Sequence, residues 1–392
     1  MAARKPPPGS QTSLREANRA RLIDTLKAHG HLTQVELAGT TGLSPATVSN
    51  IVRELTAAGV LETSYTSRSG RRATEVRLAR QAGLVAGVHI STRSMRIAIA
   101  DVGGTVVSEH SVPLAHDHRH DAELDRVALM LTDMLESLDA EMSDLLSVAI
   151  GLPVAVDVVA GVVATPGLLP GWDGVPVAER LSLRLGVPVR VDADANLGAL
   201  GEARLGAARG ASTYAYVRVG DTVSAGLMVG GQVFRGAGGK AGQLGHVTVD
   251  ENGPVCVCGS RGCLDAIAGG RALLARFPED AGIHRVRDVL LRAGRGDIAA
   301  RRVIADAGRS VGSALADLVN LFDPALVVVG GELAAADELL VAPMRHAMER
   351  AAVEGLGAAP DVVVSRLGGR AELLGAIDSA VSALPLQPVA VA

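Results

Sequence analysis

The chain has 392 residues, of which 48% are hydrophobic and 20% charged, and its formal net charge is −4. This length predicts two or three domains, and the composition excludes an intrinsically disordered protein. No run of about 18 apolar residues lacks charges or glycines, which argues against a membrane span. The sequence also shows no secretory signal, so we expect a cytoplasmic protein.

Charge is distributed unevenly along the chain. Residues 1–80 carry twelve Lys or Arg against six Asp or Glu, a net charge of +6. The whole chain has 38 basic and 42 acidic residues, so the remainder has 26 against 36, a net charge of −10. A basic head on an acidic body is typical of a nucleic-acid-binding module joined to another domain.

The basic head, residues 13–80, is predicted to be a winged helix-turn-helix domain that follows a disordered tail at 1–12. Apolar residues at helical spacing predict helices at 14–28, 34–40 and 45–58. Gly42 provides the turn before the third helix, Ser44 is its N-cap and Pro45 is its first residue.

Two parts of this head are candidates for DNA contact. The outward face of the third helix presents small polar groups, an Asn that can pair with adenine and an Arg that can bind guanine or phosphate. That face consists of Ala46, Thr47, Ser49, Asn50 and Arg53. Strands predicted at 60–63 and 74–78 enclose a wing loop at 67–72, which carries Arg68, Arg71 and Arg72. We therefore predict binding to double-stranded operator DNA as a homodimer or homotetramer; the alternative is a small helical interaction domain with a solvated polar face.

From residue 84 onward, apolar strands alternate with helical stretches. Strands are predicted at 84–90, 96–101, 147–151, 187–191, 214–219, 225–229 and 325–329. Helices are predicted at 121–139, 176–185, 195–207, 296–321 and 334–353. The polar run at 116–120, with three histidines, is interpreted as a solvated loop. This alternation predicts an α/β domain over residues 84–385, with a parallel or mixed sheet flanked by helices.

All three cysteines lie within eight residues, at Cys256, Cys258 and Cys263, and His246 lies ten residues upstream of the first. A Cys₃His set suits a closed tetrahedral zinc site of structural type. The alternatives are a disulfide with one spare thiol, or three buried cysteines that act as small apolar groups. An odd number of cysteines without a secretory signal favours reduced thiols, and their clustering favours a metal. We therefore predict a structural Zn²⁺ ion in the segment 246–263.

Several short segments together resemble the ROK family, which groups sugar-responsive repressors with sugar kinases. They are Gly151–Pro153, Leu169–Pro176, Asp194–Asn196, Gly242–His246 and the cysteine run. The resemblance covers residues 14–385, including the winged head, which the kinase members lack. It implies an α/β fold of two lobes, of the actin-like and ribonuclease-H-like type, behind the head.

Kinase members of this family bind ATP through an Asp-x-Gly-Gly-Thr turn after the first strand, a second glycine-rich turn and a late Gly-Gly pair. Asp101–Thr105 has the first pattern but comes one strand too late, so we interpret it as an ordinary hairpin turn. At the position that the resemblance implies, His89 replaces the Mg²⁺-binding aspartate, and Ser91 and Thr92 replace the glycines. Asp221 occupies the second turn, where it would repel a phosphate. We therefore expect no ATP turnover.

Kinase members hold sugar hydroxyls with an Asn-Asp pair, a Glu-x-Gly-His segment and a Glu two residues after the last cysteine. Here the resemblance places Asp194 at the general-base position and Ala193 at the Asn position. Gln243 and Asp265 stand at the two glutamate positions, and both can still bind hydroxyls. The predicted effector-binding residues are Asp194, Asn196, Gln243, His246 and Asp265. For Asp194 and Asn196 the alternative is helix capping, whereas His246 could bind zinc through one ring nitrogen and face the ligand with the other.

The sequence therefore predicts a DNA-binding transcriptional regulator of ROK type, a repressor controlled by a carbohydrate-like effector. One alternative is an active ATP-dependent sugar kinase fused to a DNA-binding head. Another is a regulator that has no small-molecule effector.

Overall fold

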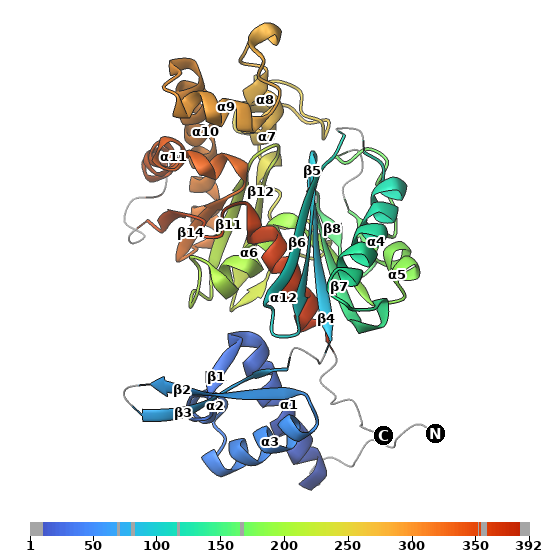
Figure 1. Ribbon diagram of the computed structural model, residues 1–392. Coiled ribbons are helices and arrows are strands. Elements are labelled where there is room, and N and C mark those ends of the chain that lie inside the picture. The colour runs from blue at the N-terminus through green and yellow to red at the C-terminus, as the bar shows by residue number, and fades with distance from the viewer. Residues whose placement is uncertain are drawn as a thin grey trace.

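The computed structural model describes residues 11–68, 71–79, 83–115, 118–164, 168–351, 353 and 359–384. Figure 1 shows a small head, drawn in blue, below a larger body of two lobes. Each lobe of the body is built on its own five-stranded sheet. Both predicted fold types, the winged helix-turn-helix head and the α/β body, are confirmed. None of the described helices is long and apolar enough to cross a membrane.

The head combines three helices with a three-stranded antiparallel sheet in the order β1-β3-β2. Its elements are α1 (Gln11–His29), β1 (His31–Thr33), α2 (Gln34–Thr41), α3 (Pro45–Ala57), β2 (Leu61–Arg68) and β3 (Arg71–Leu78). Gly42 ends α2 at a φ of 68°, a left-handed conformation that glycine adopts without strain. Ser44 then caps α3, because its side chain accepts a hydrogen bond from the backbone N–H of Thr47. The helices meet in one apolar core, in which Leu26 and Leu37 are completely buried.

Two boundaries in the head differ from the prediction. Helix α1 begins at Gln11, so the predicted tail at 1–12 is too long; residues 1–10 lie outside the described part of the chain. Strands β2 and β3 extend in register to Arg68 and Arg71, so the predicted wing loop at 67–72 is wrong in its extent. The strands were predicted from alternating apolar residues, and the serines and threonines near the tip of the hairpin do not give that pattern. A solvent-exposed two-stranded ribbon nevertheless accommodates both residue types.

The first lobe of the body contains the mixed sheet β10-β7-β4-β5-β6. Its strands are β4 (Leu84–Ile90), β5 (Ser94–Asp101), β6 (Val106–Pro113), β7 (Leu145–Leu152) and β10 (Val189–Ala193). One face of this sheet packs against α4 (His120–Glu136) and α5 (Val177–Leu185), beside the small hairpin of β8 (Val156–Asp157) and β9 (Val162–Val163). The core on this face encloses Trp172, which is fully buried.

The second lobe contains the sheet β13-β12-β11-β14-β15. Its strands are β11 (Tyr214–Val219), β12 (Val223–Val229), β13 (Gln232–Val233), β14 (Leu326–Gly330) and β15 (Asp361–Val364). Its outer face packs against α7 (Leu264–Ala268), α8 (Gly270–Leu274), α9 (Val286–Gly294), α10 (Ile298–Phe322) and α11 (Glu338–Ala351). Short 3₁₀ turns complete the body: η2 (Met142–Asp144), η3 (Leu244–His246), η4 (Glu279–Ala281), η5 (Glu332–Ala336) and η6 (Gly368–Arg370).

Two helices, α6 (Asp194–Leu205) and α12 (Ala371–Ser382), lie between the two sheets (Figure 1). Helix α12 packs on the sheet of the first lobe, and α6 packs on β11 and β12 of the second. The two helices approach each other closely because each has a glycine at the contact. A Cβ atom on Gly375 would lie 1.7 Å from the carbonyl oxygen of Leu197, and one on Gly201 would lie 2.3 Å from that of Ala371. The helix pair therefore joins the two lobes.

The body contacts the head through Val102 and Leu384. Val102, in the turn between β5 and β6, is buried in the core of the head. Leu384, just beyond α12, packs on the same core, and its carbonyl oxygen accepts a hydrogen bond from Lys27 Nζ at 3.1 Å. Helix α12 therefore connects the region between the lobes with the head.

Most predicted elements of the body are present, and those at 84–90 and 214–219 match β4 and β11 to the residue. The sequence did not predict β6, α9, α12 or β15. The predicted solvated loop at 116–120 is wrong at His118, which is 6% exposed and packs edge-on against Trp172. His116 lies outside the described residues.

Candidate functional site

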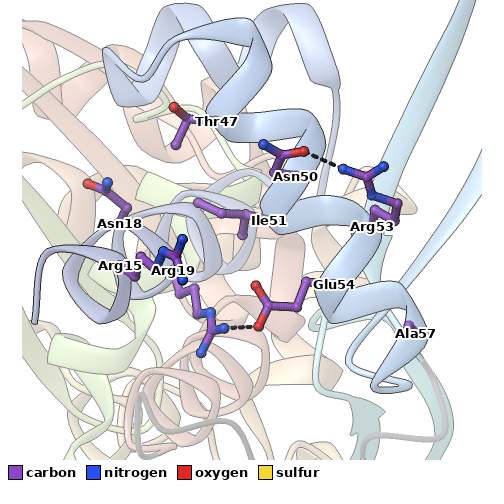
Figure 2. Close-up of a pocket in the computed structure, with 9 residues that line it drawn as sticks. All are labelled: Arg15, Asn18, Arg19, Thr47, Asn50, Ile51, Arg53, Glu54 and Ala57. Atoms are coloured by element: carbon purple, nitrogen blue, oxygen red, sulfur yellow. Dashed lines mark hydrogen bonds and ion pairs between the residues drawn. The ribbon is translucent and has the colours of Figure 1, made fainter. Parts of the chain in front are cut away.

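Helix α3 turns a polar face to solvent. Ala46, Ser49, Asn50 and Arg53 are exposed and Thr47 is half-buried, whereas the opposite face is buried in the head core. Arg53 donates a hydrogen bond to Oδ1 of Asn50, so the two longest polar side chains of this face are held together (Figure 2). For the wing, the side chains of Arg68, Arg71 and Arg72 lie outside the described residues.

A groove of about 630 Å³ lies between α1 and α3 (Figure 2). Its polar walls are formed by Arg15, Asn18 and Arg19 of α1 and by Asn50, Arg53 and Glu54 of α3. Glu54 forms an ion pair with Arg19, which fixes one arginine of α1 beside the polar face of α3. The contribution of α1 was not predicted from the sequence. The sequence does contain a pattern that indicates it, because Arg15, Asn18 and Arg19 are spaced to share one helix face.

The four predicted zinc ligands lie together. The ligand atoms of His246, Cys256, Cys258 and Cys263 are all within 4.8 Å of one another. His246 ends η3 and Cys263 precedes α7, while the other two cysteines lie on the loop between these elements. Cys256 and Cys263 are buried and Cys258 is exposed.

The dimensions of this cluster fit a tetrahedral zinc ion. Zinc–sulfur bonds of about 2.3 Å and zinc–nitrogen bonds of about 2.0 Å imply ligand separations of roughly 3.8 Å for two sulfurs and roughly 3.5 Å for a sulfur and a nitrogen. The Sγ atoms of Cys258 and Cys263 are 3.7 Å apart, and Cys256 Sγ lies 3.6 Å from His246 Nδ1. Burial and the neighbouring thiols raise the pKa of the Cys263 thiol to about 12. A bound cation would stabilise the thiolate and so lower this pKa. The cluster can therefore hold a metal ion.

The two turns at the positions where the family resemblance implies phosphate turns meet across the cleft between the lobes. The first is the β4–β5 hairpin turn, in which Ser91 and Ser94 are joined by backbone and side-chain hydrogen bonds. Thr92 of this turn donates its hydroxyl to Asp221 Oδ2 at 2.5 Å, and Arg93 Nε lies 4.0 Å from the same oxygen. Asp221 belongs to the turn between β11 and β12 in the other lobe. We call this contact the clasp.

Asp101–Thr105 forms the hairpin turn between β5 and β6, as predicted. The backbone N–H of Asp101 donates to Thr105 O, and the Asp101 carboxylate accepts from the N–H groups of Gly103 and Thr105. The neighbouring Val102 is buried in the head core rather than in the cleft. This turn therefore lies against the head.

Asp194 lies in a buried cluster of charged groups between the lobes. Its Oδ2 lies 3.3 Å from Arg218 Nε and 3.5 Å from His89 Nε2. Arg218 Nε also lies 3.3 Å from Glu372 Oε1, which accepts a hydrogen bond from Tyr216 OH at 2.9 Å. All five side chains are less than a tenth exposed. The cluster connects β4, α6, β11 and α12.

Arg218 determines the charge state of this cluster. Burial alone would raise the pKa of Asp194, but the Arg218 guanidinium and His89 outweigh it, and this pKa is held below its ordinary value. Burial opposes the charge of Arg218, but Asp194 and Glu372 hold its pKa above the ordinary range. Asp194 is thus an ion-paired carboxylate, a poor acceptor for a proton.

The other predicted effector residues lie around this cluster and the metal ligands. Asn196 donates to Asp192 Oδ1 at 2.7 Å, so its amide belongs to a local network, while the N-cap of α6 is Ala193 and lacks a side-chain cap. Asp265 accepts a hydrogen bond from the backbone N–H of Val223 at 2.8 Å, and burial raises its pKa. The hydrogen bond from Val223 acts on this pKa in the opposite direction. Gln243, directly before η3, is half-buried.

Relatives of this chain include a repressor and a glucokinase. The putative xylose repressor of Caldicellulosiruptor sp. (strain Rt8B.4) is 29% identical over 95% of this chain and 98% of its own length. A glucokinase of Streptomyces coelicolor is 31% identical over 76% of this chain and 98% of its own length. The match to the repressor thus includes the head, whereas the match to the glucokinase does not.

A solved structure and two family models agree with this division. The crystal structure of a ROK family transcriptional regulator, a homologue of the E. coli MLC protein, superposes with a TM-score of 0.74 at 23% identity, over 94% of this chain and 96% of that one. A winged helix-turn-helix DNA-binding model matches residues 15–62. The ROK family model matches residues 85–382, and this chain belongs to the ROK family.

Proposed function

We propose that this protein is a DNA-binding transcriptional regulator, a repressor, that a carbohydrate-like effector controls. The observation that carries the proposal is the combination of two features in one chain. The head exposes a polar face on α3 that can contact DNA. In the body, the clasp joins the two turns that would bind phosphate in a kinase of the family. We infer that the head binds DNA and that the clasp replaces contacts that a nucleoside triphosphate would need.

The buried cluster supports a sensing role rather than a catalytic one. A general base has to accept a proton from a sugar hydroxyl, and ion pairing with Arg218 opposes that step. Asp221 adds a negative charge where the phosphates of a nucleotide would lie. We therefore propose that the chain has no sugar kinase activity.

In this proposal, DNA is contacted by the exposed face of α3 and by the wing. The residues concerned are Ala46, Thr47, Ser49, Asn50, Arg53, Arg68, Arg71 and Arg72. Arg15 and Asn18 of α1 add phosphate contacts, because they share the groove with Asn50 and Arg53. The protein acts in the cytoplasm as a homodimer or homotetramer, so that two heads read two half-sites of an operator.

The effector is proposed to bind between the lobes. Asp194, Asn196, Gln243, His246 and Asp265 are the proposed effector-binding residues. His246, Cys256, Cys258 and Cys263 would hold a structural Zn²⁺ ion, which would fix the loop that carries Gln243 and Asp265. The proposed domains are the head at 13–80, preceded by the tail, and the sugar-binding body at 84–385.

DNase I footprinting on the DNA upstream of the protein's own gene tests the proposal. A protected near-palindromic site that is lost on addition of a sugar or sugar derivative is the expected result. Protection that no compound alters would favour a regulator without a small-molecule effector. Absence of any protected site would contradict the proposal.

The second candidate function is an active sugar kinase fused to a DNA-binding head, because a 31% identical relative is a glucokinase. Coupled measurement of ADP release with common hexoses and pentoses separates the two candidates. We expect no ADP release above the rate without sugar.

A further inference from the structure

One of the cysteines in the proposed metal site is open to solvent. Cys258 is exposed, and so are the residues on either side of it, whereas Cys256 and Cys263 are buried. The reactivity of a cysteine toward an oxidant depends on access to its sulfur. A small oxidant that diffuses in from solvent therefore reaches the sulfur of Cys258 before it reaches the other two.

A second thiol lies next to the exposed one. The Sγ atoms of Cys258 and Cys263 are 3.7 Å apart, and a disulfide requires a separation of about 2 Å. We call these two residues the thiol pair. The remaining cysteine faces the histidine, since Cys256 Sγ lies 3.6 Å from His246 Nδ1. Rotation of the exposed Cys258 side chain can therefore join the thiol pair while the other two ligands stay where they are.

Backbone hydrogen bonds hold the cysteine loop in shape. The N–H of Cys256 donates to the carbonyl oxygen of Ser260 at 2.8 Å, and the N–H of Gly259 donates to that of Cys256 at 2.9 Å. The N–H of Gly262 donates to the carbonyl oxygen of Pro254 at 2.8 Å. These bonds do not involve the sulfurs, so they keep the thiol pair together when the sulfurs change partners.

We propose that Cys258 is an oxidation site for hydroperoxides and that Cys263 converts the oxidised product to a disulfide. In the first step the Cys258 thiolate attacks a peroxide oxygen. The S–O bond forms, the O–O bond breaks, and the leaving oxygen takes a proton from solvent. In the second step the Cys263 thiolate attacks the Cys258 sulfur. The S–S bond forms, the S–O bond breaks, and the departing hydroxide takes a proton from solvent. The two sulfurs lose two electrons in all, and the peroxide gains them.

Oxidation would remove two of the four proposed metal ligands. His246 and Cys256 alone cannot complete a closed tetrahedral site, so a zinc ion bound there would be released. Reduction of the disulfide would restore the two thiolates and with them the site. This consequence rests on the proposed zinc site, whereas formation of the disulfide does not.

The oxidation site is linked to the clasp through α7 and α8. Cys263 directly precedes α7, and Asp265 in the first turn of this helix accepts a hydrogen bond from the N–H of Val223 at 2.8 Å. The N–H of Gly270, at the start of α8, donates to the carbonyl oxygen of Asp221 at 3.0 Å. Loss of the metal would therefore remove a restraint next to the β11–β12 turn, which forms one half of the clasp. On the proposed function, a hydroperoxide would thus be a second input to the regulator.

Peroxide titration of the purified full chain tests this inference. Hydrogen peroxide is the probe, a chromogenic chelator measures released zinc, and mass spectrometry of alkylated peptides locates the disulfide. We expect a disulfide between Cys258 and Cys263, release of the bound zinc and a lower Tm, all reversed by dithiothreitol and added zinc. Replacement Cys258→Ala should slow thiol oxidation about tenfold or more, because the remaining thiols are buried.

Two further variants separate the oxidation site from an effect on folding. Ser260→Ala changes an exposed side chain of the same loop and should be oxidised as the wild type is. Cys256→Ser removes a metal ligand but leaves the thiol pair, so it should still form the disulfide. If neither the wild type nor Cys256→Ser forms it, the inference is wrong.

Other outcomes distinguish this inference from the proposals on which it builds. A disulfide that includes Cys256, or oxidation of Cys258 that dithiothreitol does not reverse, would overturn the inference and leave the proposed function intact. If the purified chain holds no zinc but forms the disulfide of the thiol pair, the proposed metal site is wrong and the oxidation site is supported. Operator footprinting of the reduced chain tests the proposed function separately.

Discussion

The Thr92 hydroxyl donates a hydrogen bond to Asp221 Oδ2 at 2.5 Å, which joins the β4–β5 turn of the first lobe to the β11–β12 turn of the second. The family resemblance implies phosphate turns that bind through the backbone of glycines. Here Thr92 contributes a side-chain donor and Asp221 a carboxylate acceptor. The two substitutions complement each other. This contact holds the two lobes together on this side of the cleft.

The clasp makes a measurable contribution to stability. Removal of its carboxylate in Asp221→Ala should lower the free energy of unfolding by about 1–3 kcal/mol, because a hydrogen bond to a charged acceptor is lost. The variant should show no ADP release. Thr132→Ala, which removes an exposed hydroxyl bonded only within α4, is the control for denaturant unfolding. A variant that releases ADP with a sugar would show that the clasp alone had blocked catalysis.

The buried cluster predicts a large effect for Arg218. Arg218→Met leaves Asp194 and Glu372 buried without a cation, so we expect a loss of about 3–5 kcal/mol at pH 7. The exposed Arg301 gives the matched control Arg301→Met, which should change the stability by less than about 0.5 kcal/mol. Urea unfolding monitored by the fluorescence of Trp172, the single tryptophan, measures both.

The same cluster predicts a dependence on pH. Because the pKa of Asp194 is depressed in the folded state, its contribution to stability is present above the unfolded pKa of about 3.9 and is lost as the pH falls through the lower folded value. In Arg218→Met, burial should instead raise this pKa. The stability difference between variant and wild type should therefore shrink between pH 7 and pH 4. A constant difference over this range would contradict the ion pairing.

The proposed metal site predicts stoichiometric zinc in the purified protein. The exchange Cys263→Ser should remove the metal and lower Tm, because Cys263 is the completely buried ligand next to α7. Ser260→Ala, in the same loop, should retain zinc. Metal analysis by inductively coupled plasma mass spectrometry before and after chelation gives the stoichiometry. Absence of zinc, or its retention in Cys263→Ser, would disprove the assignment.

The head predicts separable effects on DNA binding. Asn50→Ala should weaken specific binding by about 1–3 kcal/mol and relax the preference for one base pair. Arg15→Ala should weaken binding to all sequences and reduce the salt dependence by about one charge, because Arg15 is proposed to contact phosphate. Operator titrations at several salt concentrations distinguish the two, with Arg301→Ala as the control. Identical behaviour of Asn50→Ala and Arg15→Ala would contradict the division of roles.

The sequence predicted those features of the fold that depend on local patterns. Apolar runs identified β4 and β11, and the caps at Ser44 and Gly42 placed α3 correctly. The convergence of His246 with the cysteines also followed from spacing and glycine turns. Helix α12 was not predicted from the sequence. Its small residues, such as Gly375, allow close contact with another helix and do not form the amphipathic pattern that indicates a helix.

The chemistry of the cleft could not be predicted in the same way. Arg218 lies within an apolar strand, and nothing in its neighbourhood indicates that it pairs with Asp194 and with Glu372, which is 154 positions further on. Likewise, Thr92 and Asp221 are separated by 129 positions. Such pairs depend on how the two sheets stack around α6 and α12, which is a property of the tertiary structure.

Two readouts on one preparation test whether the chain regulates transcription and has no sugar kinase activity. Fluorescence anisotropy of a labelled duplex from the region upstream of its own gene measures operator binding, and a coupled assay on the same sample measures ADP release. We expect tight, salt-dependent binding that a sugar derivative reverses, with no ADP release for any sugar. Sugar-dependent ADP release from a sample that does not bind the duplex would contradict it.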